Sequence, residues 1–161
     1  MSPRAPRVAH LASSVVTFLG FLLLCGPARS ADWDLGLRTG LYTDIEEAFV
    51  GVEGLGRIGS TDFFLNPNAE VVFVDNGDLV TLSLDVHYDL ELDTHPVDVW
   101  LGAGPTVLFR DLDRGRGDDD FGLNLLAGVG LREGAVRPYG QLKVILADDT
   151  EAVLAFGIRF F

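Results

Sequence analysis

The segment from Thr81 to Leu90 (TLSLDVHYDL) alternates polar and apolar residues without a break. Side chains leave a β-strand on opposite faces with a period of two, so this segment predicts a strand with one polar and one apolar face. No segment after residue 30 has a convincing helical period, and turn-forming residues recur at short intervals. The chain from residue 31 onward is therefore expected to be all-β.

Eight strands are expected in this part of the chain, joined as an antiparallel up-and-down barrel. Most are about ten to thirteen residues long, which exceeds the roughly five or six of a usual soluble strand and suits a tilted strand that crosses a bilayer. Asn76-Gly77 predicts a tight hairpin, because both residues accept a positive φ. The expected strands are 32–42, 47–58, 63–74, 79–91, 97–109, 121–132, 137–146 and 151–161.

The first thirty residues have the pattern of a secretory signal. Arg4 and Arg7 precede a short apolar run, 11–24, and the small residues of Ala28-Arg29-Ser30 suit a signal peptidase. Cleavage before Ala31 would remove three arginines and the only cysteine, leaving a chain more acidic than the whole sequence, whose net charge is −12. We expect an exported domain, residues 31–161, without disulfides, and such an acidic chain is an unfavourable partner for nucleic acid.

Alternation alone leaves two orientations open. In a secreted or periplasmic lipocalin-like carrier, the apolar rows would line a cavity for a small hydrophobic ligand and the polar rows would meet water. In a transmembrane barrel, the apolar rows would meet lipid and the polar rows would fill the lumen. Glycines favour the second arrangement, because several lie on the polar face, where a narrow lumen leaves little room. These glycines are Gly36, Gly40, Gly51, Gly102, Gly104, Gly128 and Gly130.

Aromatic residues gather near the expected strand ends, as in the two girdles of membrane barrels. One girdle is predicted from Trp33, Phe63, Phe64, Tyr88 and Trp100, and the other from Tyr42, Phe73, Phe109 and Phe121.

The connections after the odd-numbered strands are acidic, so one pole of the barrel is predicted to be acidic. The longest, 111–120 (DLDRGRGDDD), carries carboxylates of the kind that bind calcium or magnesium. Its spacing does not match a helix-loop-helix calcium loop, and a solvated charged loop is the simpler interpretation. No metal site is assigned, and the residues of the possible divalent-cation site are Asp111, Asp113, Asp118, Asp119 and Asp120.

The sequence ends in Phe160-Phe161 on an amphipathic final strand. With the export signal and the even strand count, this pattern resembles the small eight-stranded outer-membrane barrels, the OmpX-like and OmpA transmembrane-domain group. Arg159 interrupts the apolar row that this family usually carries at the end. The resemblance implies an outer-membrane location, contact with lipid and lipopolysaccharide, termini in the periplasm, and recognition of Phe160 and Phe161 by the barrel assembly machinery. It does not name an extracellular partner.

In that orientation, charged side chains face a lumen too narrow for bulk water, so a lattice of paired charges is expected to fill it. A gated ion path through the same groups is the alternative. The expected lumen residues are Arg38, Glu53, Glu70, Asp85, His87, Asp89, Arg132, Lys143 and Arg159.

Ser83, Asp85 and His87 are the residue types of a hydrolase triad, which leaves a membrane-embedded hydrolase or acyltransferase as a third hypothesis. Alternate residues of one strand lie about 7 Å apart, so a serine there does not reach the imidazole. The expectation is a structural or surface-interaction protein without enzymatic activity or cofactor.

Overall fold

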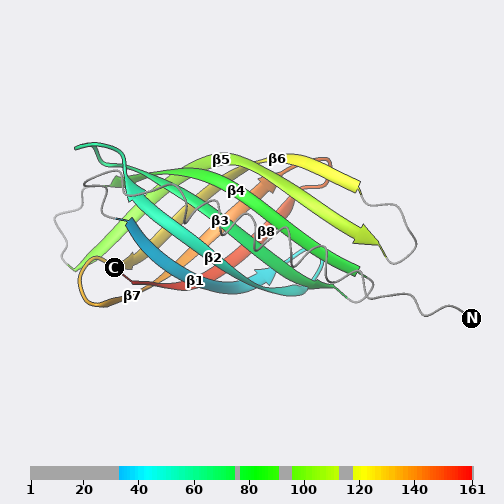
Figure 1. Cartoon of the computed structure of the whole chain (residues 1–161), viewed down its shortest axis with the longest axis horizontal. Coiled ribbons are helices and arrows are strands. Elements are labelled where there is room, and N and C mark those ends of the chain that lie inside the picture. Colours follow the sequence, from blue (N-terminus) through cyan, green and yellow to red (C-terminus); the bar gives the residue numbers. More distant parts are fainter. Residues whose placement is uncertain (1–32, 75–76, 91–95, 113–117, 161) are drawn as a thin grey trace, which may run out of the picture. The chain divides into compact units, whose positions relative to one another are not determined.

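The computed structural model describes residues 33–74, 77–90, 96–112 and 118–160, with side chains described at all of these except 77, 78, 111, 112 and 118. The expected signal sequence and Phe161 lie outside the described residues. Eight antiparallel strands form a closed barrel in which each strand pairs with the next and β8 pairs with β1 (Figure 1). The all-β, eight-stranded antiparallel prediction is confirmed. The strands are β1 Trp33–Tyr42, β2 Glu47–Arg57, β3 Phe63–Val74, β4 Gly77–Leu90, β5 Val97–Leu112, β6 Asp118–Leu131, β7 Val136–Leu146 and β8 Glu151–Phe160.

Two poles follow from this topology. The hairpin pole holds the connections that follow β1, β3, β5 and β7, and the terminal pole is the end where β1 begins and β8 finishes. Among the described residues, no helix is long and apolar enough to cross a membrane.

The strands around the acidic segment differ from the expectation. β5 continues to Leu112 and β6 begins at Asp118, and their pairing reaches Arg110 opposite Asp118. Residues 111, 112 and 118–120 of the predicted loop therefore belong to strands, and residues 113–117 lie outside the described residues. A β-ladder is held by main-chain hydrogen bonds, so it extends into water without apolar side chains to mark it in the sequence.

The hairpin after β3 differs by one residue. Val74 pairs with Gly77, so Gly77 belongs to β4 and only residues 75 and 76 separate the paired ends. The predicted Asn76-Gly77 turn was misplaced, because hairpin register follows the full ladder as well as the local turn preference.

The polar rows face the lumen and the apolar rows face outward. On β4, Ser83, Asp85 and His87 are buried, while Leu84 and Val86 between them are exposed. The other strands repeat this arrangement, so the lipocalin-like alternative, which needs apolar rows around a cavity, is wrong. The exposed outward side chains include Leu35, Leu37, Leu41, Val50, Leu101, Leu123, Leu125, Val129, Leu142, Leu154 and Phe156.

The lumen is filled in layers along the barrel. An apolar layer lies toward the hairpin pole, a charged layer follows, and three buried residues, Trp100, Leu126 and Tyr139, pack together toward the terminal pole. Gly128 lies against the Trp100 ring and Gly157 against the Tyr139 ring, where a Cβ would overlap the aromatic atoms. The apolar layer consists of Tyr42, Phe49, Val72, Leu79, Leu108, Ile145, Val153 and Ala155.

The aromatic girdles are only partly as predicted. Residues exposed on the outer surface are Trp33, Phe63 and Tyr88 near the terminal pole, and Phe73 and Phe121 near the hairpin pole.

Tyr42 and Trp100 do not belong to the girdles, because both are buried in the lumen. Phe64 also faces inward, where it lines a cavity. These three residues occupy lumen positions of their strands, and strand register, not aromatic character, sets the direction of a side chain.

Candidate functional site: the charged lumen and the cavity at the terminal pole

Glu70 on β3 is the centre of the buried charge layer. Lys143 on β7 donates from Nζ to both of its carboxylate oxygens, at 2.9 and 2.8 Å. Arg38 on β1 approaches the same carboxylate at 3.1 Å, and the Tyr42 hydroxyl donates to it at 2.6 Å. The side chains of Arg38, Glu70 and Lys143 are fully buried, so the Glu70 carboxylate is neutralised by two cations without access to water.

Glu53 on β2 forms a second centre nearer the terminal pole. Arg159 on β8 donates from Nε at 2.7 Å, and Arg38 Nη1 lies 3.5 Å from the other carboxylate oxygen. Asn66 donates from its amide nitrogen at 3.2 Å. Arg38 therefore links the two carboxylates, and the network joins five strands around the barrel, β1, β2, β3, β7 and β8. Arg159 also lies 4.8 Å from the Trp100 ring centre and 4.3 Å from that of Tyr139.

Asp85 is buried and has no ion pair with any residue that the structure describes. Its two carboxylate oxygens each accept a hydrogen bond of 2.9 Å, one from Asn68 and one from Asn124. Asp85 was predicted to belong to the charge lattice, but its two amide partners were not predicted. Asparagine on a polar row is a common lumen residue, and nothing in the linear pattern marks it as the partner of a particular carboxylate.

Ser83, Asp85 and His87 do not form a triad. The Ser83 hydroxyl is 2.9 Å from the Thr106 hydroxyl, and Asp85 is held by the two amides. The His87 ring stacks on Trp100, with ring centres 5.9 Å apart and planes 11° apart, and its Nε2 has no hydrogen-bond partner among the described residues. The three side chains have separate surroundings, so the geometry does not support nucleophilic catalysis at Ser83.

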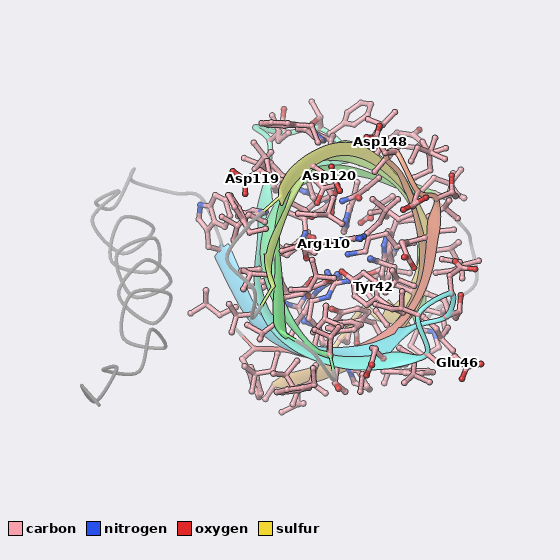
Figure 2. The ribbon with its side chains drawn as sticks, turned by 90° about the vertical axis from the view of Figure 1, so that its right-hand side faces the viewer. Tyr42, Glu46, Arg110, Asp119, Asp120 and Asp148 are labelled. Carbon is pink, nitrogen blue, oxygen red and sulfur yellow. The ribbon has the colours of Figure 1, made fainter. Side chains whose placement is uncertain are left out.

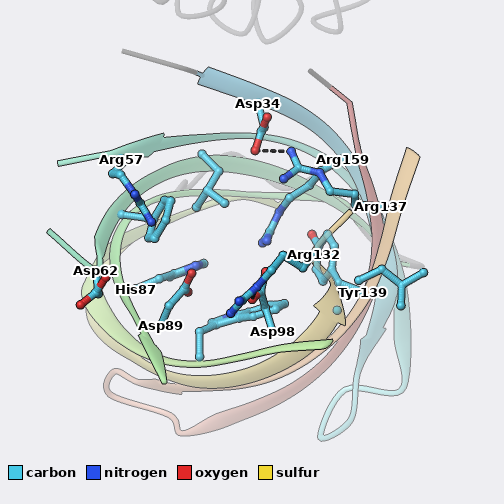
Figure 3. Close-up of a pocket in the computed structure, with 15 residues that line it drawn as sticks. Asp34, Arg57, Asp62, His87, Asp89, Asp98, Arg132, Arg137, Tyr139 and Arg159 are labelled. Atoms are coloured by element: carbon cyan, nitrogen blue, oxygen red, sulfur yellow. Dashed lines mark hydrogen bonds and ion pairs between the residues drawn. The ribbon is translucent and has the colours of Figure 1, made fainter. Parts of the chain in front are cut away.

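Asp89 and Arg132 lie at the terminal pole and not in the central network. Both line a cavity of about 480 Å³ whose walls also include Asp34, Arg57 and Arg137 (Figure 3). Arg132 follows the end of β6 and was wrongly assigned to the strand, because the β6 ladder stops at Leu131. It pairs at this rim with Asp98, at 2.5 Å.

The cavity also contains charged groups that were not predicted as lumen residues. Asp34 on β1 pairs with Arg137 on β7, and Arg57 lies over the Phe64 ring with 5.1 Å between the guanidinium carbon and the ring centre. These residues lie on the lumen side of strand ends. Their position on the polar rows could have identified them as lumen residues. Their contacts could not be predicted, because the partners lie on strands far apart in sequence.

The possible divalent-cation residues remain largely untested. Asp113 lies outside the described residues, and the side chains of Asp111 and Asp118 are not described. Asp119 is exposed and Asp120 is half-buried at the hairpin pole, where Arg110 and Tyr42 point into the lumen (Figure 2). Within the described part of the chain, no group of three or more histidine, cysteine, aspartate or glutamate residues is placed to hold a metal ion. Cation binding by the acidic segment stays a prediction.

Comparison with solved structures establishes the fold class. The N-terminal β-barrel domain of Pseudomonas aeruginosa OprF matches with a TM-score of 0.66 and 14% identity, covering 81% of this chain and 98% of that one. Neisserial surface protein A matches with a TM-score of 0.63 and 15% identity, covering 82% and 99%. This chain has the fold of the small eight-stranded outer-membrane β-barrels. No family model matches the sequence, and no curated protein matches it.

The eight-stranded outer-membrane barrel fold tolerates very different sequences. Ail of Yersinia pestis matches with a TM-score of 0.52, 11% identity and coverage of 81% of this chain and 96% of that one. Ail has also been determined in complex with a heparin analogue, sucrose octasulfate. At these identities the likeness shows the fold alone.

Proposed function

We propose that this chain is an outer-membrane β-barrel protein with a structural or surface-interaction role and no catalytic activity. The observation that carries the proposal is the division of its surfaces. The barrel presents leucine, valine and phenylalanine rows outward and buries an ion-pair network inside, formed by Arg38, Glu53, Glu70, Lys143 and Arg159. Such an exterior is favourable in lipid and unfavourable in water, where so large an apolar surface promotes association.

In this proposal the hairpin pole faces the cell exterior and the terminal pole faces the periplasm. The connections at the hairpin pole are rich in aspartate and glutamate, so they remain hydrated outside the bilayer. We do not expect this chain to share the ligand of the Ail complex, because its acidic connections would repel a polysulfated molecule. We expect sucrose octasulfate not to bind this barrel.

The lumen supports a closed barrel and not a pore. The apolar layer near the hairpin pole places Phe49, Val72, Ile145 and Val153 across the lumen with no exposed surface. An ion crossing this layer would lose its hydration without gaining a polar partner. Purified protein in planar bilayers is expected to show no stable channel currents, and regular conductance steps at moderate voltage would contradict a closed lumen.

The proposed orientation in the outer membrane is tested by single-cysteine labelling. Cys25 is the only cysteine of the sequence and lies in the expected signal, so Asp148→Cys and Ser60→Cys would each introduce one thiol into the exported domain. Both positions are exposed, the first at the hairpin pole and the second in the β2–β3 connection at the terminal pole. In intact cells a membrane-impermeant maleimide should label Asp148→Cys and leave Ser60→Cys unlabelled until the outer membrane is permeabilised.

Fractionation completes this test. The protein should appear in the outer membrane, and an unheated sample should migrate differently in a gel from a boiled one. Recovery of an aqueous, heat-insensitive protein would overturn the proposal.

The same proposal includes assembly and envelope contacts. Phe160 lies on the outer face of β8, in keeping with recognition of Phe160 and Phe161 by the barrel assembly machinery. Replacing Phe161 with alanine should reduce insertion in cells but not refolding of the purified chain in detergent. Divalent cations held by the acidic segment would bridge it to lipopolysaccharide, and calcium titration that shows neither heat nor a change in melting temperature would exclude this.

A further inference from the structure

The β5–β6 hairpin extends beyond its neighbour β7. β5 and β6 remain paired from the terminal pole up to Arg110 opposite Asp118, whereas the pairing of β6 with β7 goes no further than Leu123 opposite Leu146. Figure 1 shows the ends of β5 and β6 reaching past those of β7 and β8 at the hairpin pole. In the described part of the chain, the segment Asp118–Gly122 therefore has a partner strand on its β5 side only. We refer to this segment as the β6 edge.

A strand that is paired on one side only leaves main-chain N–H and C=O groups on its other side available for pairing. In an antiparallel ladder, alternate residues direct their N–H and C=O groups to opposite sides. Along the β6 edge, the groups on the side away from β5 have no strand partner among the described residues. Such an edge is a template on which another extended segment can pair.

The outer part of this edge lies beyond the apolar surface of the barrel. Leu125, Leu123 and Phe121 form the outward row of β6, and Phe121 is 78% exposed. The next outward residue, Asp119, is also exposed. Since an aromatic residue followed by a charged one marks the change from hydrocarbon to water in a membrane barrel, the edge from Asp118 to Asp120 is accessible to a soluble partner.

The charge of the edge selects the kind of partner. Residues 118–120 are three consecutive aspartates, and Asp119 and Asp120 lie at the rim of the hairpin pole (Figure 2). A second copy of this chain pairing through the same edge would bring like charges opposite one another, which destabilises a strand pair. A segment with lysine or arginine at alternate positions would instead place a cation beside the carboxylates.

We propose that the β6 edge binds an extended, basic segment of a partner protein as an added β-strand. This inference rests on the proposed function only in placing the edge outside the cell; the pairing geometry does not depend on it. Main-chain hydrogen bonds supply the pairing, the aspartates select the basic side chains, and the exposed Phe121 ring offers an apolar contact for one of them.

The test uses the full exported domain refolded in detergent micelles, and thus does not depend on cellular location. The probe is a synthetic peptide with lysine and threonine or valine in alternation, and binding is measured by calorimetry. Two further peptides of the same composition carry N-methyl groups on all amides of one edge or of the other. If the peptide adds as a strand, methylation of one edge should abolish binding and methylation of the other should leave it intact.

Variants of the barrel provide the second arm of the test. Asp119 and Asp120 lie on opposite faces of β6, so the alternate lysines of the peptide face one of them. The double variant Asp119→Lys, Asp120→Lys should weaken binding about tenfold, because a cross-strand attraction becomes a repulsion whichever face carries the lysines. Asp44→Lys and Glu46→Lys in one chain form the matched control, since they reverse two exposed charges in the β1–β2 connection at the same pole, on strands that are not neighbours of β6, and binding should be nearly unchanged. Heat-dependent gel migration checks that each variant is folded.

Three results would overturn the inference. They are the absence of binding to the unmodified barrel, equal binding of the two methylated peptides, and equal weakening by the two double variants. The last two would indicate attraction to the acidic pole as a whole. Failure of labelling at Asp148→Cys would overturn the proposed orientation but not this pairing, so the two proposals fail separately.

Discussion

Lys143 and Glu70 form a fully buried ion pair across the lumen, with Nζ within hydrogen-bonding distance of both carboxylate oxygens. The two residues are 73 positions apart in the chain and lie on β7 and β3, which are not neighbours in the barrel. The contact therefore depends on barrel closure and tethers opposite parts of the wall.

Breaking this pair from one side should strongly destabilise the barrel. Glu70→Gln leaves Lys143 and Arg38 buried beside a neutral amide, and we expect a loss of about 3 to 5 kcal/mol in the free energy of unfolding. Replacing both partners, with Glu70→Leu and Lys143→Met, should cost less than the single change, because no buried lysine is left unpaired and Arg38 retains its contact with Glu53. Urea unfolding in lipid vesicles measures both. Asp98→Asn, which breaks the partly exposed pair with Arg132, is the control and should cost much less than Glu70→Gln, because water screens this pair.

The two tryptophans should report opposite environments. Trp33 is 44% exposed on the outer face, and Trp100 is 2% exposed inside the lumen. In vesicles of brominated lipid, the Trp100→Phe variant, which retains Trp33, should be strongly quenched, and the Trp33→Phe variant should be quenched little. Strong quenching of Trp100 alone would mean that the faces of the barrel are reversed.

Glycine at position 128 provides the space for the Trp100 ring. A Cβ at this position would overlap the indole, so Gly128→Ala should cost about 1 to 3 kcal/mol through displacement of the ring. Gly140→Ala is the matched control on the neighbouring strand, where the closest atom to an added Cβ is 3.8 Å away on Phe156. Equal effects of the two changes on denaturant midpoint would show that the packing around Trp100 is not the cause.

His87 should be replaceable by phenylalanine but not by alanine. Its ring stacks on Trp100 while its buried Nε2 has no partner among the described residues. His87→Phe keeps the stacked ring and removes a buried polar atom whose missing hydrogen bond costs about 1 to 3 kcal/mol. The free energy of unfolding should therefore be unchanged or higher. His87→Ala should lose roughly 2 kcal/mol or more by opening a cavity. A large loss with phenylalanine would show that the imidazole nitrogen has a partner, such as a buried water.

Much of the barrel could be predicted because the relevant information is local. The alternation on β4 and β8 indicates two-faced strands, and strand length indicates a bilayer. The extension of β5 and β6 escaped prediction because the aspartates beyond the apolar rows carry no alternation, although the ladder continues through Arg110 and Asp118. Arg132 was assigned to the lumen network by its place on a polar row, but the strand ends one residue before it.

The linear order of side chains was sufficient to specify strands, and with them the set of residues that share a face, since that set follows from a period of two. It did not specify which side chains contact one another across the lumen. Asp85 faces two asparagines and no cation, Arg38 joins Glu53 to Glu70, and Trp100 lies inside instead of at the membrane surface. These contacts join strands far apart in sequence, and they exist only after β1 pairs with β8 and the ring of strands fixes every register at once.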